Sequence, residues 1–300
     1  MKTISFYNEK GGVGKSTFSM IYASWLRYKH GKKVAVVDLN KRVTSYRATE
    51  VKIKTDLQVI DQYDLDKVWP IIIPKKEDLN KFEGQMLPLS HWLNDKIRNE
   101  LSDMDVLVID LPGAASNREL ASMIFGKHVG LFVIPTDRGQ MSTRATVATC
   151  NAINLTAKYD VRTAVFLNQI QTYVSVETYE AIAETLMGIK IPVLPDMIAC
   201  SERLKAIGRE NIICSTLEYP DWNLDAFRGS RDLGLENLFI DVTRLLKDSM
   251  EHENTGPADL SFVDALEKEF RNERQLMHSS FAELDFPPEA FPEKRRIKKT

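Results

Sequence analysis

The stretch "NEKGGVGKST", residues 8–17, decides the fold because it resembles a phosphate-binding loop. The ordinary loop reads G-x-x-x-x-G-K-[ST] and lies between a strand and a helix. Here the loop ends in the required Gly-Lys-Ser, residues 14–16, but Glu9 stands where the first glycine belongs. Lys10 adds a second cation ahead of the central glycines. The stretch therefore predicts a polyphosphate site that has lost a glycine and gained a lysine.

Short apolar runs, most of them followed by a helical pattern, make up much of the chain. The runs are residues 3–8, 33–40, 105–113, 129–136 and 162–169, and helical patterns cover about 16–30, 142–158, 175–187 and 235–246. The runs are continuous rather than alternating, which is typical of strands buried on both faces. This pattern predicts an α/β fold of the phosphate-loop NTPase type, with a doubly wound, mostly parallel sheet flanked by helices. Ligands of such sheets bind beyond the carboxyl ends of the strands.

Two regions interrupt the alternation of strands and helices. Residues 51–104 separate two strands by more than a usual crossover and include an amphipathic helix near 91–101. Beyond about residue 250 the chain becomes polar, with a helix candidate at 260–277 and the basic, proline-rich end "FPPEAFPEKRRIKKT". We therefore expect an ATPase-type domain over 1–248 and a C-terminal helical and polar extension over 249–300.

The overall composition is that of a globular chain with no targeting segment. Its 40 basic and 42 acidic residues nearly cancel, so any nucleic-acid-binding patch would have to be local. Cys150, Cys200 and Cys214 are widely spaced and contain no C-x-x-C, which predicts reduced, buried cysteines. The first residues lack the apolar segment of a signal peptide, and no apolar run approaches ~18 residues. We expect a cytoplasmic protein.

The loop supplies the first part of a phosphate site. Its backbone N–H groups would face a polyphosphate, and the start of the following helix would add its dipole. Lys15 would reach the β- and γ-phosphate oxygens, and Ser16 would hold Mg²⁺. The loop residues expected to contact the nucleotide are Gly11, Gly12, Val13, Gly14, Lys15 and Ser16.

Two acids end neighbouring apolar runs and complete the predicted site. Asp110 ends "VLVID" and is expected to orient the water shell of the metal, so that Ser16 and Asp110 form the metal site. Asp38 ends "VAVVD". For Asp38 a catalytic role and a simple turn-capping role both remain open.

These motifs resemble those of a known superfamily. "KGGVGKST", residues 10–17, is a deviant Walker A motif, and the chain resembles the ParA/MinD superfamily of ATPases. It is most similar to ParA-like partition ATPases that lack an N-terminal DNA-binding domain, because the chain starts on its first strand. Further matches occur in family order at "VVDLN" (36–40), "VLVIDLPG" (106–113), "LFVIPT" (131–136) and "VFLNQ" (165–169), and the resemblance covers residues 1–248.

The resemblance implies a role for the second lysine. Lys10 would reach across a face-to-face homodimer and touch the nucleotide of the other subunit, which would make ATP a signal for dimerisation. Thr17 would contact the α-phosphate, and Asn168 would read adenine. Pro112 and Gly113 would sense the γ-phosphate, and Pro195-Asp196 would flank the base.

One position departs from the superfamily pattern. Relatives often read D-x-D-P-Q after the second strand, where the second acid handles the attacking water, whereas residues 38–42 read D-L-N-K-R. Asn40 cannot accept a proton as a carboxylate does, so we expect slow intrinsic ATP hydrolysis. The catalytic set is therefore expected to comprise Lys10, Lys15, Asp38, Asn40 and Asp110, with Asp38 as the alternative group that handles the water.

The leading functional hypothesis is a ParA-like ATPase that positions or partitions plasmid or mobile-element DNA. It would bind DNA non-specifically as an ATP dimer and be released by a ParB-like partner that stimulates hydrolysis. Arg203, Lys205 and Arg209 are candidate DNA contacts. A MinD-like membrane positioner is an alternative, but the tail shows no amphipathic helix, which argues against a membrane partner. A metal carrier would need paired cysteines, and the three widely spaced cysteines argue against it. A small-molecule synthase would need a carboxylate-substrate pocket, which the sequence does not identify.

Overall fold

The computed structural model describes residues 1–39, 71–72, 86–112, 123, 127–137, 139–156, 161–170, 184–185, 191–199, 235–252 and 255. All of them belong to one compact unit, Met1–Leu260. Asn40, Gly113 and the candidate DNA contacts at 203–209 lie outside the described residues, as do Cys200, Cys214 and nearly all of the extension. The proposed boundary after residue 248 therefore stays a prediction.

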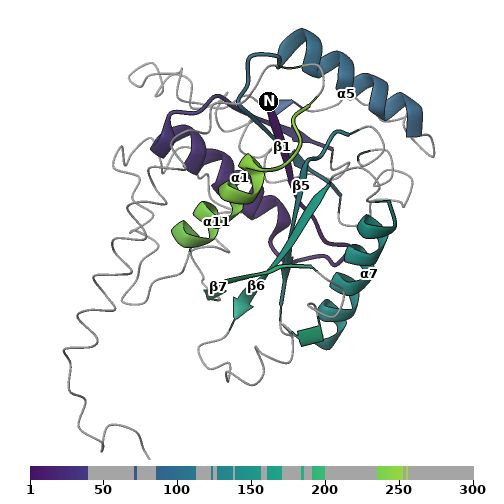
Figure 1. Cartoon of the computed structure of the whole chain (residues 1–300), viewed down its shortest axis with the longest axis vertical. Helices are drawn as coiled ribbons and strands as arrows, with labels where there is room; N and C mark the ends of the chain where they lie inside the picture. The colour runs from purple at the N-terminus through teal and green to yellow at the C-terminus, as the bar shows by residue number, and fades with distance from the viewer. Residues whose placement is uncertain are drawn as a thin grey trace, which may run out of the picture. The chain divides into compact units, whose positions relative to one another are not determined.

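The described strands form one seven-stranded sheet in the order β3-β2-β4-β1-β5-β6-β7. Figure 1 labels β1, β5, β6 and β7 of this sheet. Every strand pair in it is parallel, which confirms the predicted fold class. The strands are β1 (Lys2–Phe6), β2 (Val34–Asp38), β3 (Ile71–Ile72), β4 (Val106–Asp110), β5 (Leu131–Thr136), β6 (Arg162–Ile170) and β7 (Val193–Ala199). All five predicted runs are strands, whereas β3 and β7 were not predicted. The central strand β1 leads directly into the loop.

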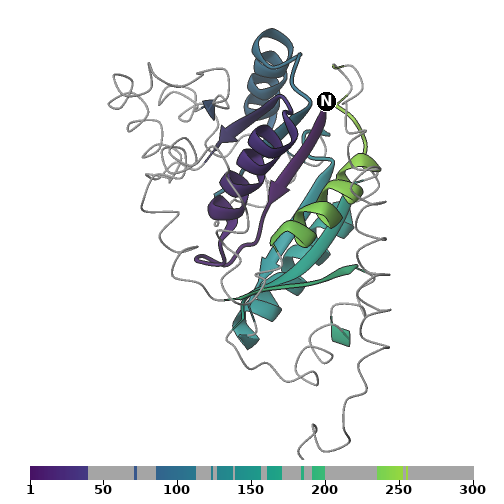
Figure 2. The ribbon, with the colours of Figure 1, turned by 90° about the vertical axis from the view of Figure 1, so that its left-hand side faces the viewer.

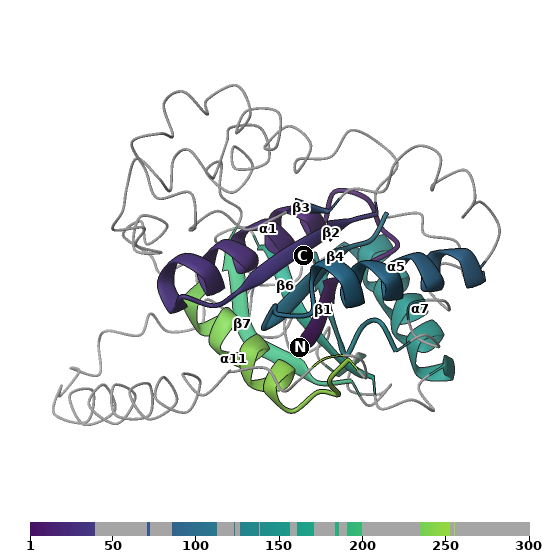
Figure 3. The same cartoon turned by 90° about the horizontal axis from the view of Figure 1, so that it is seen from above.

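Helices cover both faces of this sheet. They are α1 (Lys15–Ser24), the π-helical turn η1 (Trp25–Lys29) that continues it, α5 (Met86–Glu100), α7 (Gln140–Thr156) and α11 (Leu235–Lys247). Helices α1 and α11 lie on one face, and α5 and α7 lie on the other (Figures 2 and 3). Gly31 follows the first helical segment with φ 63°, the left-handed conformation expected of a helix-ending glycine. No helix of the described residues is long and apolar enough to cross a membrane.

The two faces bury different side chains. Aromatic rings dominate under α1 and α11, where Tyr22 lies 5.3 Å from Phe239 and 5.7 Å from Phe6 between ring centroids. Aliphatic side chains dominate under α5 and α7, and Cys150 is buried there as a free thiol, as expected for that residue. Burial on both faces fixes the register of each strand, because a slip of one residue would move every side chain to the opposite face of the sheet.

The strand register brings the two predicted acids together. Asp38 is the register partner of Asp110 at the carboxyl ends of β2 and β4. Both residues are fully buried. The loop after β1, the ends of these two strands and the ends of β5 and β6 all lie at the same edge of the sheet, because parallel strands end together.

Candidate nucleotide site

The loop between β1 and α1 depends on two glycines in left-handed conformations. Gly12 has φ 78° and Gly14 has φ 95°, a region that side chains rarely adopt. Gly14 precedes α1, and its carbonyl accepts the first helical hydrogen bond, from the N–H of Phe18 at 2.8 Å. A Cβ on Gly14 would also lie 2.9 Å from the amide nitrogen of Asn168. Glycine is therefore required there for both conformation and space.

Lys15 begins α1 with its side chain turned back over the loop. Its Nζ donates to the carbonyl oxygen of Lys10 at 2.6 Å, and the residue is buried. Burial lowers the pKa of this ammonium, and the nearby Asp110 carboxylate opposes that shift. The first turn of α1 contains no acidic residue. A buried cation at a helix N-terminus is a favourable place for phosphate oxygens.

Ser16 and Asp110 meet beside Lys15. The hydroxyl of Ser16 donates to Oδ2 of Asp110 at 2.7 Å. Burial raises the pKa of the Asp110 carboxyl to about 7, the Ser16 hydrogen bond opposes this rise, and the neighbouring Asp38 adds to it. Two buried acids at adjacent strand ends thus share a region of high negative potential that favours a proton or a cation.

The donor set fits a magnesium ion. Among the described residues, Oδ1 of Asp110 is buried without a hydrogen-bond partner, so one hard oxygen is left to be satisfied. Mg²⁺ is usually held by one or two carboxylates together with waters and phosphate oxygens, rather than by an all-protein cage. The described residues contain no cluster of three or more His, Cys, Asp or Glu side chains that could form such a cage. Ser16 and Asp110 would hold the ion, which would neutralise phosphate charge.

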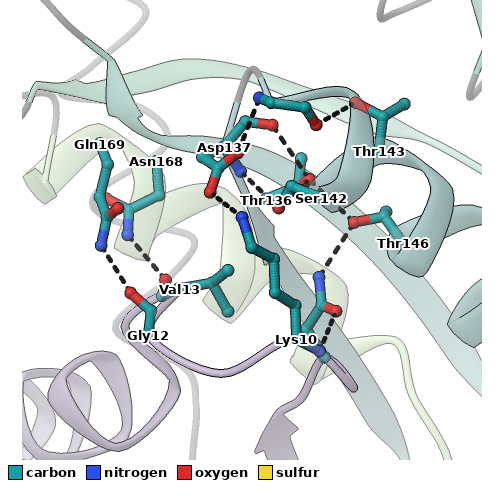
Figure 4. Close-up of polar contacts among 12 residues, drawn as sticks. Lys10, Gly12, Val13, Thr136, Asp137, Ser142, Thr143, Thr146, Asn168 and Gln169 are labelled. Atoms are coloured by element: carbon teal, nitrogen blue, oxygen red, sulfur yellow. Dashed lines mark hydrogen bonds and ion pairs between the residues drawn. The ribbon is translucent and has the colours of Figure 1, made fainter.

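Lys10 occupies a separate position, on the α7 side of the loop. Its Nζ forms a 2.6 Å ion pair with Asp137, which follows β5, and about a third of the lysine side chain is exposed (Figure 4). Asp137 is itself fixed, because its Oδ1 accepts the backbone N–H of Gly139 at 2.7 Å just before α7. The two lysines of the loop are therefore distinct: Lys15 is buried near the acids, and Lys10 lies partly in solvent.

A chain of buried polar groups supports Lys10 from below. The amide of Asn8 donates to the carbonyl of Pro135 at 3.0 Å and to the hydroxyl of Thr146 at 2.9 Å. Oδ1 of Asn8 accepts the backbone N–H of Lys10 at 2.9 Å. Thr146 in turn donates to Thr136 at 2.8 Å. Sequence reasoning missed Asn8, Asp137 and Thr146. The available signals were that Asn8 ends one predicted strand and that Asp137 follows another.

Asn168 and Gln169, at the end of β6, contact the loop from its other side. Nδ2 of Asn168 donates to the Val13 carbonyl at 2.8 Å, and Nε2 of Gln169 donates to the Gly12 carbonyl at 2.7 Å (Figure 4). Asn168 was expected to read adenine, and the structure places its amide on the backbone of the loop. Pro195, expected beside the base, is exposed in β7.

The sequence of this chain matches a known family model over more than half of its length. A model described as "AAA domain" matches residues 1–165, which contain the loop, Asp38, Asp110 and the Lys10–Asp137 pair. The chain belongs to this AAA domain family. No curated protein has a significant sequence match to the chain.

Solved structures with the same fold include a plasmid partition protein and a cell division complex. Apo McdA from Cyanothece matches with TM-score 0.57 and 18% identity, over 82% of this chain and 99% of its own. A putative plasmid partition protein from Borrelia burgdorferi B31, bound to AMPPNP, matches with TM-score 0.58 and 16% identity, over 81% and 98%. The MinC:MinD cell division complex of Aquifex aeolicus matches with TM-score 0.53 and 16% identity, over 84% and 98%. These likenesses establish the fold. With the AAA domain match, they bear out the predicted resemblance to the ParA/MinD superfamily.

Proposed function

We propose that this protein binds ATP with Mg²⁺, forms a homodimer when ATP is bound, and hydrolyses ATP slowly. The observation that carries the proposal is the separation of its two loop lysines. Lys15 lies buried beside the Ser16–Asp110 pair, where a chain binds its own phosphate. The side chain of Lys10 is partly exposed. Among the contacts described for it, its ammonium pairs with the partly exposed Asp137, so it can be offered to a second chain.

Lys10 supplies the proposed link between ATP and dimerisation. A cation brought to phosphate from a second subunit is effective only when two loaded chains meet, and an arginine delivered in this way contributes ~10³–10⁵ in rate in other enzymes. The expected slow turnover rests on Asn40, the amide that stands where relatives carry a carboxylate. A stimulating partner of the ParB type would then set the lifetime of the dimer.

Partition of plasmid or mobile-element DNA is the proposed role. The support is the resemblance of the motifs to the ParA/MinD superfamily and the fold shared with the Borrelia plasmid partition protein, whose bound AMPPNP also supports ATP as the ligand. DNA binding would be electrostatic and non-specific. A MinD-like role at membranes is the second candidate, since the Aquifex MinD complex shares the fold.

The first experiment measures oligomeric state by light scattering with ATP, ADP or no nucleotide. The wild type should dimerise with ATP alone. Lys10→Ala should bind ATP as a monomer and fail to dimerise, whereas Lys15→Ala should lose ATP affinity itself. Equal losses of ATP affinity in both variants would contradict the cross-subunit role of Lys10.

The second experiment distinguishes the two cellular roles. DNA retardation that requires ATP, and whose log affinity falls by about 0.9 per phosphate contact with log salt, would support partition. Binding that is insensitive to salt, or specific for one sequence, would contradict it. ATP-dependent binding to anionic liposomes in place of DNA would favour the membrane role.

A further inference from the structure

The end of β6 departs from regular strand geometry beside the loop. The pairing of β6 with β7 shifts register between Leu167 and Ile170, and Gln169 within that interval has φ 57°. Successive side chains of a regular strand point to opposite faces. In this irregular segment Asn168 and Gln169 instead both reach the same loop (Figure 4). A positive φ at a glutamine is uncommon, and such conformations concentrate at functional sites.

The two amides bind two consecutive peptide groups. Asn168 donates to the carbonyl of Val13, and Gln169 donates to the carbonyl of Gly12. In a trans peptide the carbonyl and the next N–H point in opposite directions. Fixing these two carbonyls toward β6 therefore turns the N–H groups of Val13 and Gly14 to the other side. Successive N–H groups presented in this way form an anion-binding concavity.

We propose that Asn168 and Gln169 act as an amide clamp, a pair of positioning residues that hold the loop with two backbone N–H groups directed at the phosphates. The clamp extends the proposed function and rests on it, because it acts on the same nucleotide site. It assigns a role to Gln169, for which the match at "VFLNQ" implied none, and gives Asn168 a role on the loop backbone. It also accounts for the close approach at Gly14, where a Cβ would lie 2.9 Å from the Asn168 amide.

Three substitutions at one position separate the amide from the backbone conformation. Gln169→Gly removes the amide but accepts a positive φ without strain. Gln169→Ala removes the amide and adds strain. Gln169→Glu keeps the length and shape, but a carboxylate cannot donate to the Gly12 carbonyl. Arg162→Ala, at the opposite end of β6, is the matched control, since its partly exposed side chain lies far along the strand from the loop.

The measurement is calorimetric affinity for adenosine, ADP and ATP with Mg²⁺, together with thermal stability without nucleotide. In Gln169→Gly, loss of one hydrogen bond to the loop should weaken the binding of ADP and ATP by about 2- to 12-fold. Gln169→Glu should bind ADP and ATP still more weakly, because its negative charge also repels the phosphates. Adenosine affinity should not change, and Arg162→Ala should bind like the wild type. A purely structural role would instead lower thermal stability and leave affinity unchanged.

Each outcome decides a separate claim. If Gln169→Gly binds ADP and ATP like the wild type while Gln169→Ala does not, the backbone conformation and not the amide matters, and the clamp is wrong. Equal weakening for adenosine and ADP would place the amides at the base and would also overturn it. A wild type that binds neither ADP nor ATP would refute the proposed function, and the clamp with it.

Discussion

The two flanks of the loop are built from different chemistry. On the acid side, the ends of β2 and β4, two fully buried carboxylates stand in register. On the amide side, toward the ends of β5 and β6, the groups that contact the loop backbone are neutral amides. Oδ1 of Asn8 accepts the N–H of Lys10, and Asn168 and Gln169 donate to loop carbonyls. The carboxylate of Asp137, which follows β5, is neutralised by Lys10.

The acid side therefore contributes charge to the site, and the amide side contributes geometry. Burial makes the Asp110 carboxylate costly unless a proton or metal compensates it, so the acid side is poised to bind a cation and to respond to pH. Neutral amides have no such dependence, and they act by fixing the direction of peptide groups. Substitutions on the acid side should therefore change chemistry and pH dependence, and those on the amide side should change affinity modestly.

The largest effect is expected from the substitution that restores a carboxylate after β2. Asn40→Asp should raise ATP turnover, by about 10²–10⁴-fold if the new carboxylate acts as a positioned base, with little change in ATP affinity. It should also shorten the life of the ATP dimer. Steady-state turnover of the wild type, Asn40→Asp and Asp38→Asn tests this. An unchanged rate in Asn40→Asp would remove Asn40 from the mechanism.

Asp110→Asn should nearly abolish the contribution of Mg²⁺. A metal that neutralises phosphate charge contributes several kcal/mol, so turnover should fall by at least about 100-fold. Titration of Mg²⁺ against ATP turnover and affinity is the measurement, and Arg162→Ala serves as the unaffected control. A variant with normal Mg²⁺ dependence would show that Asp110 does not hold the ion.

The pH dependence of folding should also reveal Asp110. Its pKa is raised from 3.8 to about 7 in the folded chain, so between these values the folded chain holds a proton that the unfolded chain has lost. Its contribution to stability should therefore fall as pH rises from about 4 to about 7, by up to about 4 kcal/mol, and level off outside that range. The measurement is the free energy of unfolding by denaturant as a function of pH, without nucleotide or Mg²⁺, for the wild type and Asp110→Asn. Identical pH profiles for the two proteins would contradict a raised pKa of the buried Asp110 carboxyl.

The smallest effect belongs to the Lys10–Asp137 pair. Asp137→Asn frees Lys10 from its ion pair while keeping an oxygen that can accept the Gly139 N–H. Because partly exposed ion pairs contribute ~0.2–1 kcal/mol, the ATP dimer should become roughly 1.5- to 5-fold tighter. Sedimentation with ATP across protein concentrations measures this. A weaker dimer would mean that Asp137 helps to present Lys10 rather than retain it.

The sequence predicted the strands whose burial leaves a continuous apolar run, such as β4, and the acids that end them. It could not predict β7, because Pro195 and Asp196 interrupt its apolar pattern, or β3, which is only two residues long. The local loop motif identified Lys15 and Ser16. It could not identify Asn8, Asp137 or Gln169, because their roles depend on contacts set by the sheet order rather than by spacing along the chain.

The partners of the loop are also far away along the chain, and this has a consequence for folding. Ser16 meets Asp110 across 94 residues, Lys10 meets Asp137 across 127, and Gln169 meets Gly12 across 157. Contacts of such separation form slowly, because loop closure costs entropy before the contact repays it. Chains emerge from the ribosome N-terminus first. The loop is therefore among the first segments synthesised, but its site can be completed only after β6 has joined the sheet, so a nascent chain shorter than about that strand should not bind nucleotide with native affinity.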